Sequence, residues 1–153
     1  MAVIVHDTRD RAGKHNNVDD YLVSQGHQIV RSKLYVGDVT LLNNQTVCID
    51  LKRNLAECVL NVCQQHDRFV REINRANEAG VKLIFLVEHG GSIKSLEDVK
   101  GWVNPRLKES PLAVSGERLY RIMATMQAKY NIEWHFCDKR CTGKKVVELL
   151  GLQ

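Results

Sequence analysis

The chain has 153 residues, of which 44% are hydrophobic and 26% are charged, and 22 Lys and Arg against 18 Asp and Glu give a net charge of +4. This composition is typical of an ordinary globular protein, and the mild positive charge permits nucleic-acid binding without requiring it. No segment approaches the ~20 apolar residues that a membrane span needs, and the N-terminus does not have the pattern of a signal peptide, so we expect a cytoplasmic protein with no membrane partner.

Apolar and β-branched runs bounded by turn residues predict strands, and apolar residues three and four apart predict helices. The first third of the chain is expected to contain, in order, a strand over residues 3–5, a helix over 16–25 that ends at Gly26, a strand over 28–35, and a hairpin of strands over 39–42 and 46–51.

The remainder is expected to contain helical segments between 54 and 79, a strand over 81–87, a short helix over 95–102, an exposed loop over 104–115, an amphipathic helix over 119–130, a strand over 132–136 and a final helix capped by Thr142. This order predicts one α/β domain spanning residues 1–153, with a central mixed β-sheet flanked by helices.

Five cysteines, at positions 48, 58, 63, 137 and 141, are scattered through apolar segments. Their odd number argues against a disulfide framework, and their spacing differs from that of zinc fingers and ribbons. Buried free thiols are therefore the preferred interpretation, and a cysteine-bound zinc site is the alternative.

The segment with the clearest chemical content contains Asp38 and, after eleven intervening residues, Asp50-Leu51-Lys52. Residues two apart in a strand point to the same face, so Asp50 and Lys52 present a carboxylate and an ammonium side by side, and the hairpin brings Asp38 towards them. Two carboxylates suit a hard cation such as Mg²⁺, and the ammonium is placed to orient a water and offset negative charge. A solvated strand edge or a simple salt bridge is the alternative, although charges after the apolar run 47–49 are costly unless they are paired or metal-bound.

Four short motifs follow one another along the chain: Asp7-Thr8-Arg9-Asp10 after the first strand, Gly37-Asp38, Asp50-Leu51-Lys52, and Asp67-Arg68-Phe69 with Glu72. Their order and spacing resemble the nuclease domain of the XPF family, within the PD-(D/E)xK superfamily, over nearly the whole chain. The compact size is similar to that of stand-alone members in phages and mobile elements. The resemblance implies a restriction-endonuclease-like fold and a metal-dependent endonuclease that hydrolyses the phosphodiester bonds of DNA, with branched DNA among its candidate substrates.

The resemblance also implies roles for individual residues. Asp38 and Asp50, assisted by Asp7, are expected to hold Mg²⁺ or Mn²⁺, and Lys52 is expected to position the attacking water. The candidate DNA-binding residues are Arg9, Arg53, Arg68 and Arg71, and the candidate supporting residues are Asp10 and Glu72. Structural roles are the alternatives: a loop cap for Asp7, an ion pair with Asp10 for Arg9, and a solvated helix face for Arg68 and Arg71.

Two departures from the family pattern favour a second hypothesis. Leu51 stands where the family has an arginine, and Ala56 stands where it has an aspartate. The alternative function is therefore a nuclease-fold subunit that binds DNA without cutting it and partners an active chain. The retained carboxylates and Lys52 favour the active enzyme.

Two segments carry more apolar residues than one small sheet requires: the helix over 119–130 and the terminal segment 146–152. We expect the excess to form a symmetric homodimer contact, since relatives of the resembled family commonly pair through their nuclease domains. A monomer in which both helices pack on the sheet is the alternative.

Overall fold

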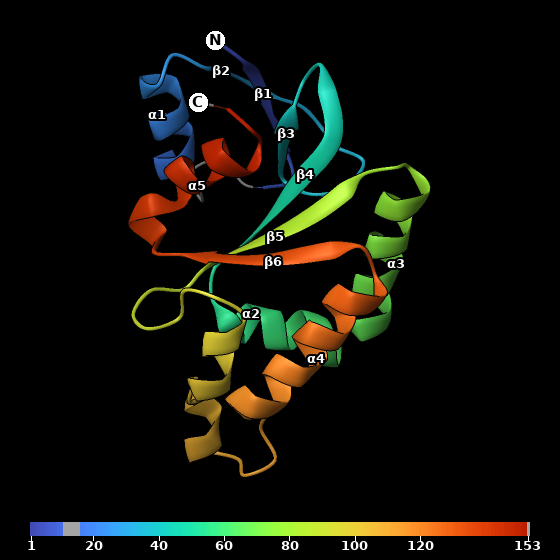
Figure 1. Cartoon of the computed structure of the whole chain (residues 1–153), viewed down its shortest axis with the longest axis vertical. Helices are drawn as coiled ribbons and strands as arrows, with labels where there is room; N and C mark the ends of the chain where they lie inside the picture. Colours follow the sequence, from blue (N-terminus) through green and yellow to red (C-terminus); the bar gives the residue numbers. More distant parts are fainter. Residues whose placement is uncertain (11–15, 153) are drawn as a thin grey trace.

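The computed structural model describes residues 1–10 and 16–152, and its framework is a six-stranded mixed sheet. In space the strands lie in the order β2 (Gln28–Arg31), β1 (Val3–His6), β3 (Val39–Leu41), β4 (Asn44–Lys52), β5 (Lys82–Glu88) and β6 (Ile132–Cys137). β3 is antiparallel to both of its neighbours, whereas β4, β5 and β6 run parallel to one another. The carboxyl ends of β4 to β6 therefore meet at one edge of the sheet, as Figure 1 shows.

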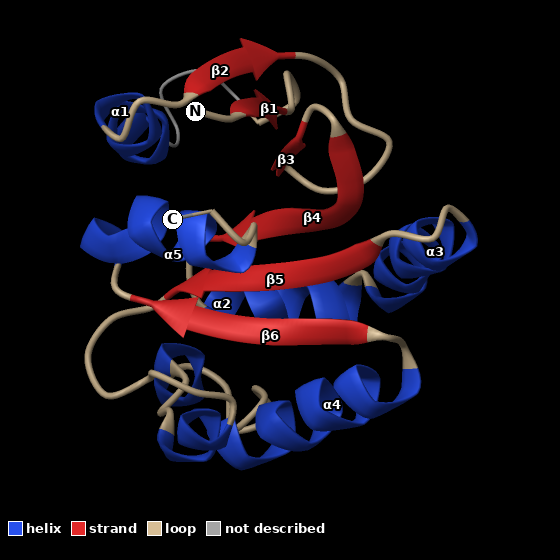
Figure 2. Cartoon of the chain, turned by 45° about the horizontal axis from the view of Figure 1, so that its top comes forward, coloured by secondary structure: helices blue, strands red, loops and turns tan. Residues whose placement is uncertain are grey.

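Helices cover both faces of the sheet (Figure 2). The described helices are α1 (Asn16–Ser24), α2 (Leu55–Val59), the π-helix η1 (Leu60–Gln64), α3 (His66–Glu78), the 3-10 helices η2 (Glu97–Gly101), η3 (Pro105–Lys108) and η4 (Lys139–Cys141), α4 (Gly116–Lys129) and α5 (Thr142–Leu149). One face is covered by α1 and α5, and the other by α2, η1, α3 and α4. This arrangement confirms the predicted α/β class with a central mixed sheet.

Side-chain alternation along the central strands divides the interior into two cores. In β5, Phe85 and Val87 belong to the core beneath α3 and α4, while Ile84 and Leu86 belong to the core beneath α1 and α5. An uninterrupted run of buried apolar residues is what a parallel strand covered on both faces requires.

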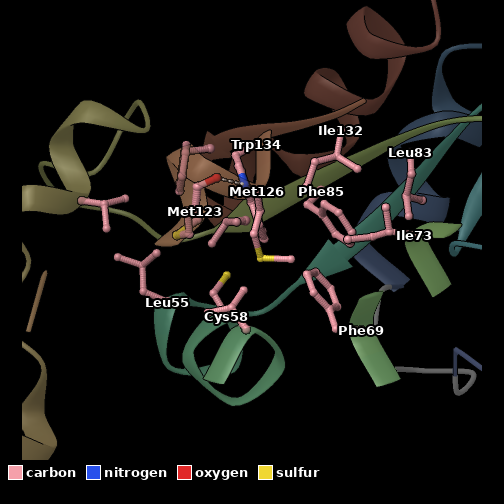
Figure 3. Close-up of a cluster of buried hydrophobic side chains, with 14 of the residues drawn as sticks. Leu55, Cys58, Phe69, Ile73, Leu83, Phe85, Met123, Met126, Ile132 and Trp134 are labelled. Atoms are coloured by element: carbon pink, nitrogen blue, oxygen red, sulfur yellow. Dashed lines mark hydrogen bonds between the residues drawn. The ribbon is translucent and has the colours of Figure 1, made fainter. Parts of the chain in front are cut away.

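Aromatic rings fill the larger core, as Figure 3 shows. The ring of Phe85 lies 4.9 Å from that of Phe69 and 4.7 Å from that of Trp134, measured between centroids. The indole N–H of Trp134 donates to the carbonyl of Met123, which satisfies its one polar group. This core holds α3 firmly against β5, so side chains projecting from α3 have fixed positions at the edge of the site described below.

Three elements differ from the sequence-based expectation. β2 ends at Arg31 because the following residues are held by side chains from the end of β1. The expected loop 104–115 contains η3, which begins with the side chain of Asn104 accepting the N–H of Arg106. The hydroxyl of Thr142 does not cap α5 but donates to a carboxylate oxygen of Glu88.

All five cysteines are free thiols, as predicted, but their burial is uneven. Cys48 and Cys58 are buried, whereas Cys141 is exposed at the surface. Among the helices of the described residues, none has the length and apolarity needed to cross a membrane.

Candidate active site

β4 carries Asp50 and Lys52 into the space beneath α3. Ile49 and Leu51 of this strand belong to the core beneath α1 and α5, so the alternate residues Asp50 and Lys52 face the opposite side. Both are 8% exposed, which means that two ionisable side chains are buried next to an aromatic core. The prediction that they share one face is confirmed.

Lys52 is held by charge and by aromatic rings. Its ammonium lies 2.9 Å from Asp50 Oδ1, and 5.5 and 5.6 Å from the ring centroids of Phe69 and Phe85. Burial lowers the pKa of Lys52, but the carboxylate of Asp50 outweighs burial and raises the pKa above its usual value. The ammonium therefore stays charged and has little freedom to move.

Asp38 reaches β4 through the turn that Gly37 makes. Gly37 has a φ of +74°, and a Cβ there would lie 3.1 Å from the Cβ of Cys48, so both conformation and space favour glycine. The N–H of Asp38 donates to the carbonyl of Ile49 at 2.8 Å, and Asp38 Oδ2 accepts the N–H of Leu51 at 2.8 Å. These two hydrogen bonds place the Asp38 carboxylate beside Asp50.

The carboxylates at this point repel one another. Burial and the neighbouring charge of Asp50 raise the pKa of Asp38 to about 8, although the N–H of Leu51 acts in the opposite direction. Glu72 of α3 also faces this point. Burial and the charge of Asp50 raise the pKa of Glu72 to about 7, and its carboxyl hydrogen-bonds to Asp50. We call Asp38, Asp50, Lys52 and Glu72 the β4 cluster: three carboxyl groups around one ammonium.

The donor set fits a hard divalent cation. Among the described residues, no three His, Cys, Asp or Glu side chains are already grouped as a complete set of metal ligands. Mg²⁺, however, commonly uses one or two carboxylates and fills its remaining positions with water and substrate phosphate. Asp38 and Asp50 supply such a pair, and the raised pKa of Asp38 is the expected response of a carboxylate that lacks a compensating cation.

A polar pocket of about 170 Å³ opens beside the β4 cluster. Its lining residues are Lys52, Asn61, Gln65, Arg68, Phe69 and Glu72. Asn61 Oδ1 is buried and accepts no hydrogen bond among the described residues. Asn61 comes from η1, and π-helical turns occur often at functional sites because they re-aim side chains. A larger cavity of about 320 Å³ lies beside α4, but it is mostly apolar and is lined by none of the β4 cluster.

Asp7 lies at the end of β1, and its carboxylate contacts the loop that precedes Asp38. Asp7 Oδ1 accepts the N–H of Leu34 at 2.9 Å, and Oδ2 accepts Arg9 Nε at 2.8 Å. Arg9 also donates to the carbonyl of Leu34 at 2.6 Å. The main chain of Asp7 donates to the carbonyl of Asp38 at 2.7 Å. Asp7 thus holds the loop of Asp38 in place, and its expected role as an extra metal ligand stays a prediction.

A second group of charged residues surrounds the buried His6. Its Nε2 lies 2.5 Å from Asp10 Oδ2, and its Nδ1 lies 2.8 Å from Asp19 Oδ1 on α1. Burial lowers the pKa of His6, but the hydrogen bonds to both carboxylates outweigh burial and raise the pKa to about 9. Arg31 donates to the carbonyl of Asp10 and lies 3.9 Å from Asp19. We call His6, Asp7, Arg9, Asp10, Asp19 and Arg31 the β1 cluster.

The four predicted DNA-binding arginines are exposed at different places around the site. Arg9 forms its ion pair with Asp7. The structural alternative, an ion pair between Arg9 and Asp10, is therefore not the one observed. Arg68 lines the polar pocket, and Arg71 lies one turn further along α3. Arg53 follows Lys52 on the chain and pairs with Glu57 at 3.2 Å. Arg68 is therefore the member placed closest to the β4 cluster.

Sequence reasoning missed two residues. His6 belongs to none of the sequence motifs, because its partner Asp19 lies thirteen positions away on α1. Asn61 carries no motif, and its position depends on the π-helical turn between α2 and α3. The sequence signal for His6 is limited to Asp10, four positions later, because the contact with Asp19 depends on how α1 packs.

The solved structures that resemble this chain include two of XPF from Aeropyrum pernix, one of which is a complex with DNA. The first matches with a TM-score of 0.66 and 20% identity, over 97% of this chain and 63% of that chain. The complex matches with a TM-score of 0.68 and 19% identity, over 99% of this chain and 64% of that chain. The chain thus spans less than two thirds of the length of these XPF chains. Neither a scan of protein-family models nor a search of curated proteins found a match. The structural likeness confirms the predicted XPF-like fold.

Proposed function

We propose that this chain, whose fold is that of the matched part of XPF, is an endonuclease that hydrolyses DNA phosphodiester bonds with the help of Mg²⁺ or Mn²⁺. The observation that carries the proposal is the β4 cluster, in which Asp38 and Asp50 lie side by side with Lys52 at 2.9 Å from Asp50. The matched XPF structure in complex with DNA supports DNA as the substrate class.

Each member of the β4 cluster has a distinct task in this proposal. Asp38 and Asp50 hold the divalent cation, which supplies charge neutralisation at the phosphate and promotes ionisation of a water. Lys52 orients the attacking water and offsets the negative charge that develops on the phosphoryl oxygens. Glu72, whose pKa is raised to about 7, is able to exchange a proton with the polar pocket near neutral pH. Asp7 and Arg9 fix the loop that presents Asp38.

DNA approaches, in this proposal, along the face of α3 that carries Arg68 and Arg71. Phosphate contacts from arginines position a duplex without reading its sequence. The polar pocket next to Arg68 is about 170 Å³, so it holds a phosphate or a few waters rather than a nucleotide. Arg53 is turned to the surface and is already paired with Glu57, so its contribution to binding is expected to be smaller.

The second candidate function is a subunit that binds DNA without cutting it. The observation that favours it is the incomplete ligand set, since the described residues contain no group of three metal-binding side chains and Ala56 supplies no carboxylate. Burying three carboxyl groups around one ammonium is nevertheless costly, and a purely DNA-binding subunit has no need of it. We therefore favour the active enzyme.

A cleavage assay decides between the two candidates. Labelled duplex, single-stranded and branched DNA are each incubated with Mg²⁺, with Mn²⁺ and with chelator. The enzyme is expected to cut at least one substrate with cation and none with chelator. Equal cutting in chelator would remove the metal mechanism, and binding without cutting in both cations would favour the inactive subunit.

The expected homodimer belongs to this proposal as well. Half-buried Ile122 of α4 and Tyr130, which follows this helix, line a mostly apolar cavity of about 320 Å³. A symmetric contact here would place two sites on one DNA molecule. Light scattering at micromolar concentration is expected to report about twice the chain mass of 17.4 kDa. A monomer that cleaves DNA at the full rate would contradict both the dimer and its role.

A further inference from the structure

An exposed tyrosine stands next to the candidate active site. Tyr35 lies in the loop between β2 and β3 and is 61% exposed, although large aromatic side chains are usually buried. Asp38 is three positions further along the chain, so the two Cα atoms are at most ~11 Å apart. That distance corresponds to about three stacked base steps of ~3.4 Å.

The loop that carries Tyr35 is fixed from both sides. On one side, Asp7 and Arg9 hold both polar main-chain groups of the preceding residue, Leu34. On the other side, Arg75 of α3 donates to the carbonyl of Tyr35 at 2.5 Å, and its guanidinium lies 5.0 Å from the centre of the tyrosine ring. The ring is therefore exposed yet held in position, which lowers the entropy cost of any ligand that stacks on it.

Arg75 also connects the ring to the β4 cluster. Arg75 and Glu72 are three residues apart on α3 and so lie on the same side of the helix, and the charge of Arg75 acts on the Glu72 carboxyl. Two further exposed cations belong to this region: Lys33 is two positions before Tyr35, and Arg9 donates to the carbonyl of the adjacent Leu34. An aromatic face surrounded by cations and close to a phosphodiester-cleaving site matches the chemistry of a nucleotide, which has a flat base and an anionic backbone.

We propose that Tyr35, backed by Arg75, is a stacking platform for an unpaired base of the bound DNA strand near the phosphate to be cut. This inference rests on the proposed function for the identity of its ligand. Within a continuous duplex both faces of every base are covered, so the platform selects strands that have an unstacked base at this position. Tyr35 thereby acts as a specificity-determining residue, and Arg75 as the residue that positions it.

The test measures binding separately from cutting. A fluorescently labelled fork with two single-stranded arms is compared, by anisotropy in chelator, with the same fork whose arm nucleotides lack their bases. The wild-type protein is expected to bind the normal fork about tenfold more tightly, the scale of one base–aromatic stack. Tyr35→Ala is expected to lose this preference, whereas Tyr35→Phe and Tyr35→Trp retain it.

Tyr120→Ala provides the matched control, because Tyr120 also carries a cation over its ring, from Lys100 at 4.4 Å, but lines none of the pocket beside the β4 cluster. Equal wild-type affinity for the normal fork and for the fork without arm bases would contradict the stacking proposal. A Tyr35→Ala variant that still prefers the normal fork would contradict it as well. If the wild-type protein cuts no DNA in Mg²⁺ or Mn²⁺, the proposed function fails, while the anisotropy measurement still decides the platform.

Discussion

Two groups of charged residues lie close together in this protein and are built in opposite ways. In the β1 cluster each carboxylate has a cationic or N–H partner: Asp7 bonds Arg9 and Leu34, and Asp19 lies between His6 and Arg31. In the β4 cluster three carboxyl groups lie near Lys52, and the pKa values of Asp38 and Glu72 are raised. A group of charges with its partners in place stabilises a fold, whereas a group with excess charge of one sign is arranged for a ligand that is still to bind.

Because the two groups contain similar residues, the comparison can be tested by making similar substitutions in each. Changes in the β1 cluster should act on stability, and changes in the β4 cluster should act on catalysis. The largest effect is expected for Lys52, the positively charged member of the β4 cluster, which orients the attacking water in the proposed reaction.

Lys52→Ala is expected to lower cleavage by about 10²-fold or more, the scale of losing one electrostatic catalyst, while DNA binding survives. Lys52→Met should have the same effect and keeps an apolar side chain over Phe69 and Phe85, so it controls for loss of packing. Single-turnover cleavage in Mg²⁺ and anisotropy in chelator measure the two quantities. A Lys52→Met variant that cuts at the wild-type rate would show that Lys52 has no catalytic role.

The β1 cluster is expected to lose stability at alkaline pH. The pKa of His6 is raised from 6.5 to about 9 in the folded protein, so its contribution is complete below about pH 6.5 and is lost as the pH rises through about 9. The loss amounts to at most ~3 kcal/mol of unfolding free energy. Chemical denaturation of the wild-type protein and of His6→Gln between pH 6 and 10 measures it. Parallel curves for the two proteins over this range would be inconsistent with a charged His6.

Replacing one aspartate by asparagine in each cluster should change stability in opposite directions. Asp38→Asn removes a carboxyl whose ionisation is disfavoured in the folded protein and keeps an acceptor for Leu51, so without cation it should stabilise the protein by roughly 1–2 kcal/mol at pH 7. Asp19→Asn removes a charged partner of His6 and should destabilise the folded protein by about 1 kcal/mol. Adding Mg²⁺ should raise the unfolding midpoint of the wild-type protein and of Asp19→Asn, but not of Asp38→Asn. Two destabilised variants would remove the distinction between the clusters.

The smallest expected effect concerns the unpartnered oxygen of Asn61. Asn61→Leu removes the buried acceptor, so its stability should change by less than ~1 kcal/mol. If that oxygen contacts a water or substrate in the polar pocket, cleavage should fall by about tenfold, the value of one hydrogen bond. Asn61→Gln, which keeps the amide but displaces it, serves as the comparison. Unchanged cleavage in both variants would show that the pocket wall at this position is passive.

The local part of the site could be predicted from the sequence. Asp50 and Lys52 share a face because strand alternation requires it, and Gly37 precedes Asp38 because the turn needs a positive φ. Both statements depend on a few neighbouring residues. The order of strands and helices could be predicted for the same reason. The apolar run of β5 and the helical spacing of apolar residues in α4 are both visible in the local sequence.

The parts that could not be predicted depend on contacts between distant segments. β2 was expected to continue to residue 35, but Asp7 and Arg9 hold Leu34 instead, and this ends the pairing. The role of His6 depends on α1 placing Asp19 against β1, which no local pattern indicates. Asn61 reaches the pocket because the chain between α2 and α3 adopts a π-helical turn.

The alternation of side chains along β4 also determines where residues can be inserted into the chain during evolution or engineering. A one-residue insertion between Cys48 and Asp50 would turn Asp50 and Lys52 towards α1 and α5 and would drive an apolar side chain under α3. The turn before β4 has no such constraint, because the pairing of β3 with β4 already shifts register between Thr40 and Leu41 and the residues at the tip are exposed. Peptide tags, reporter domains and new chain ends are therefore best introduced at residues 42–44, where added length is absorbed before the buried part of the strand begins.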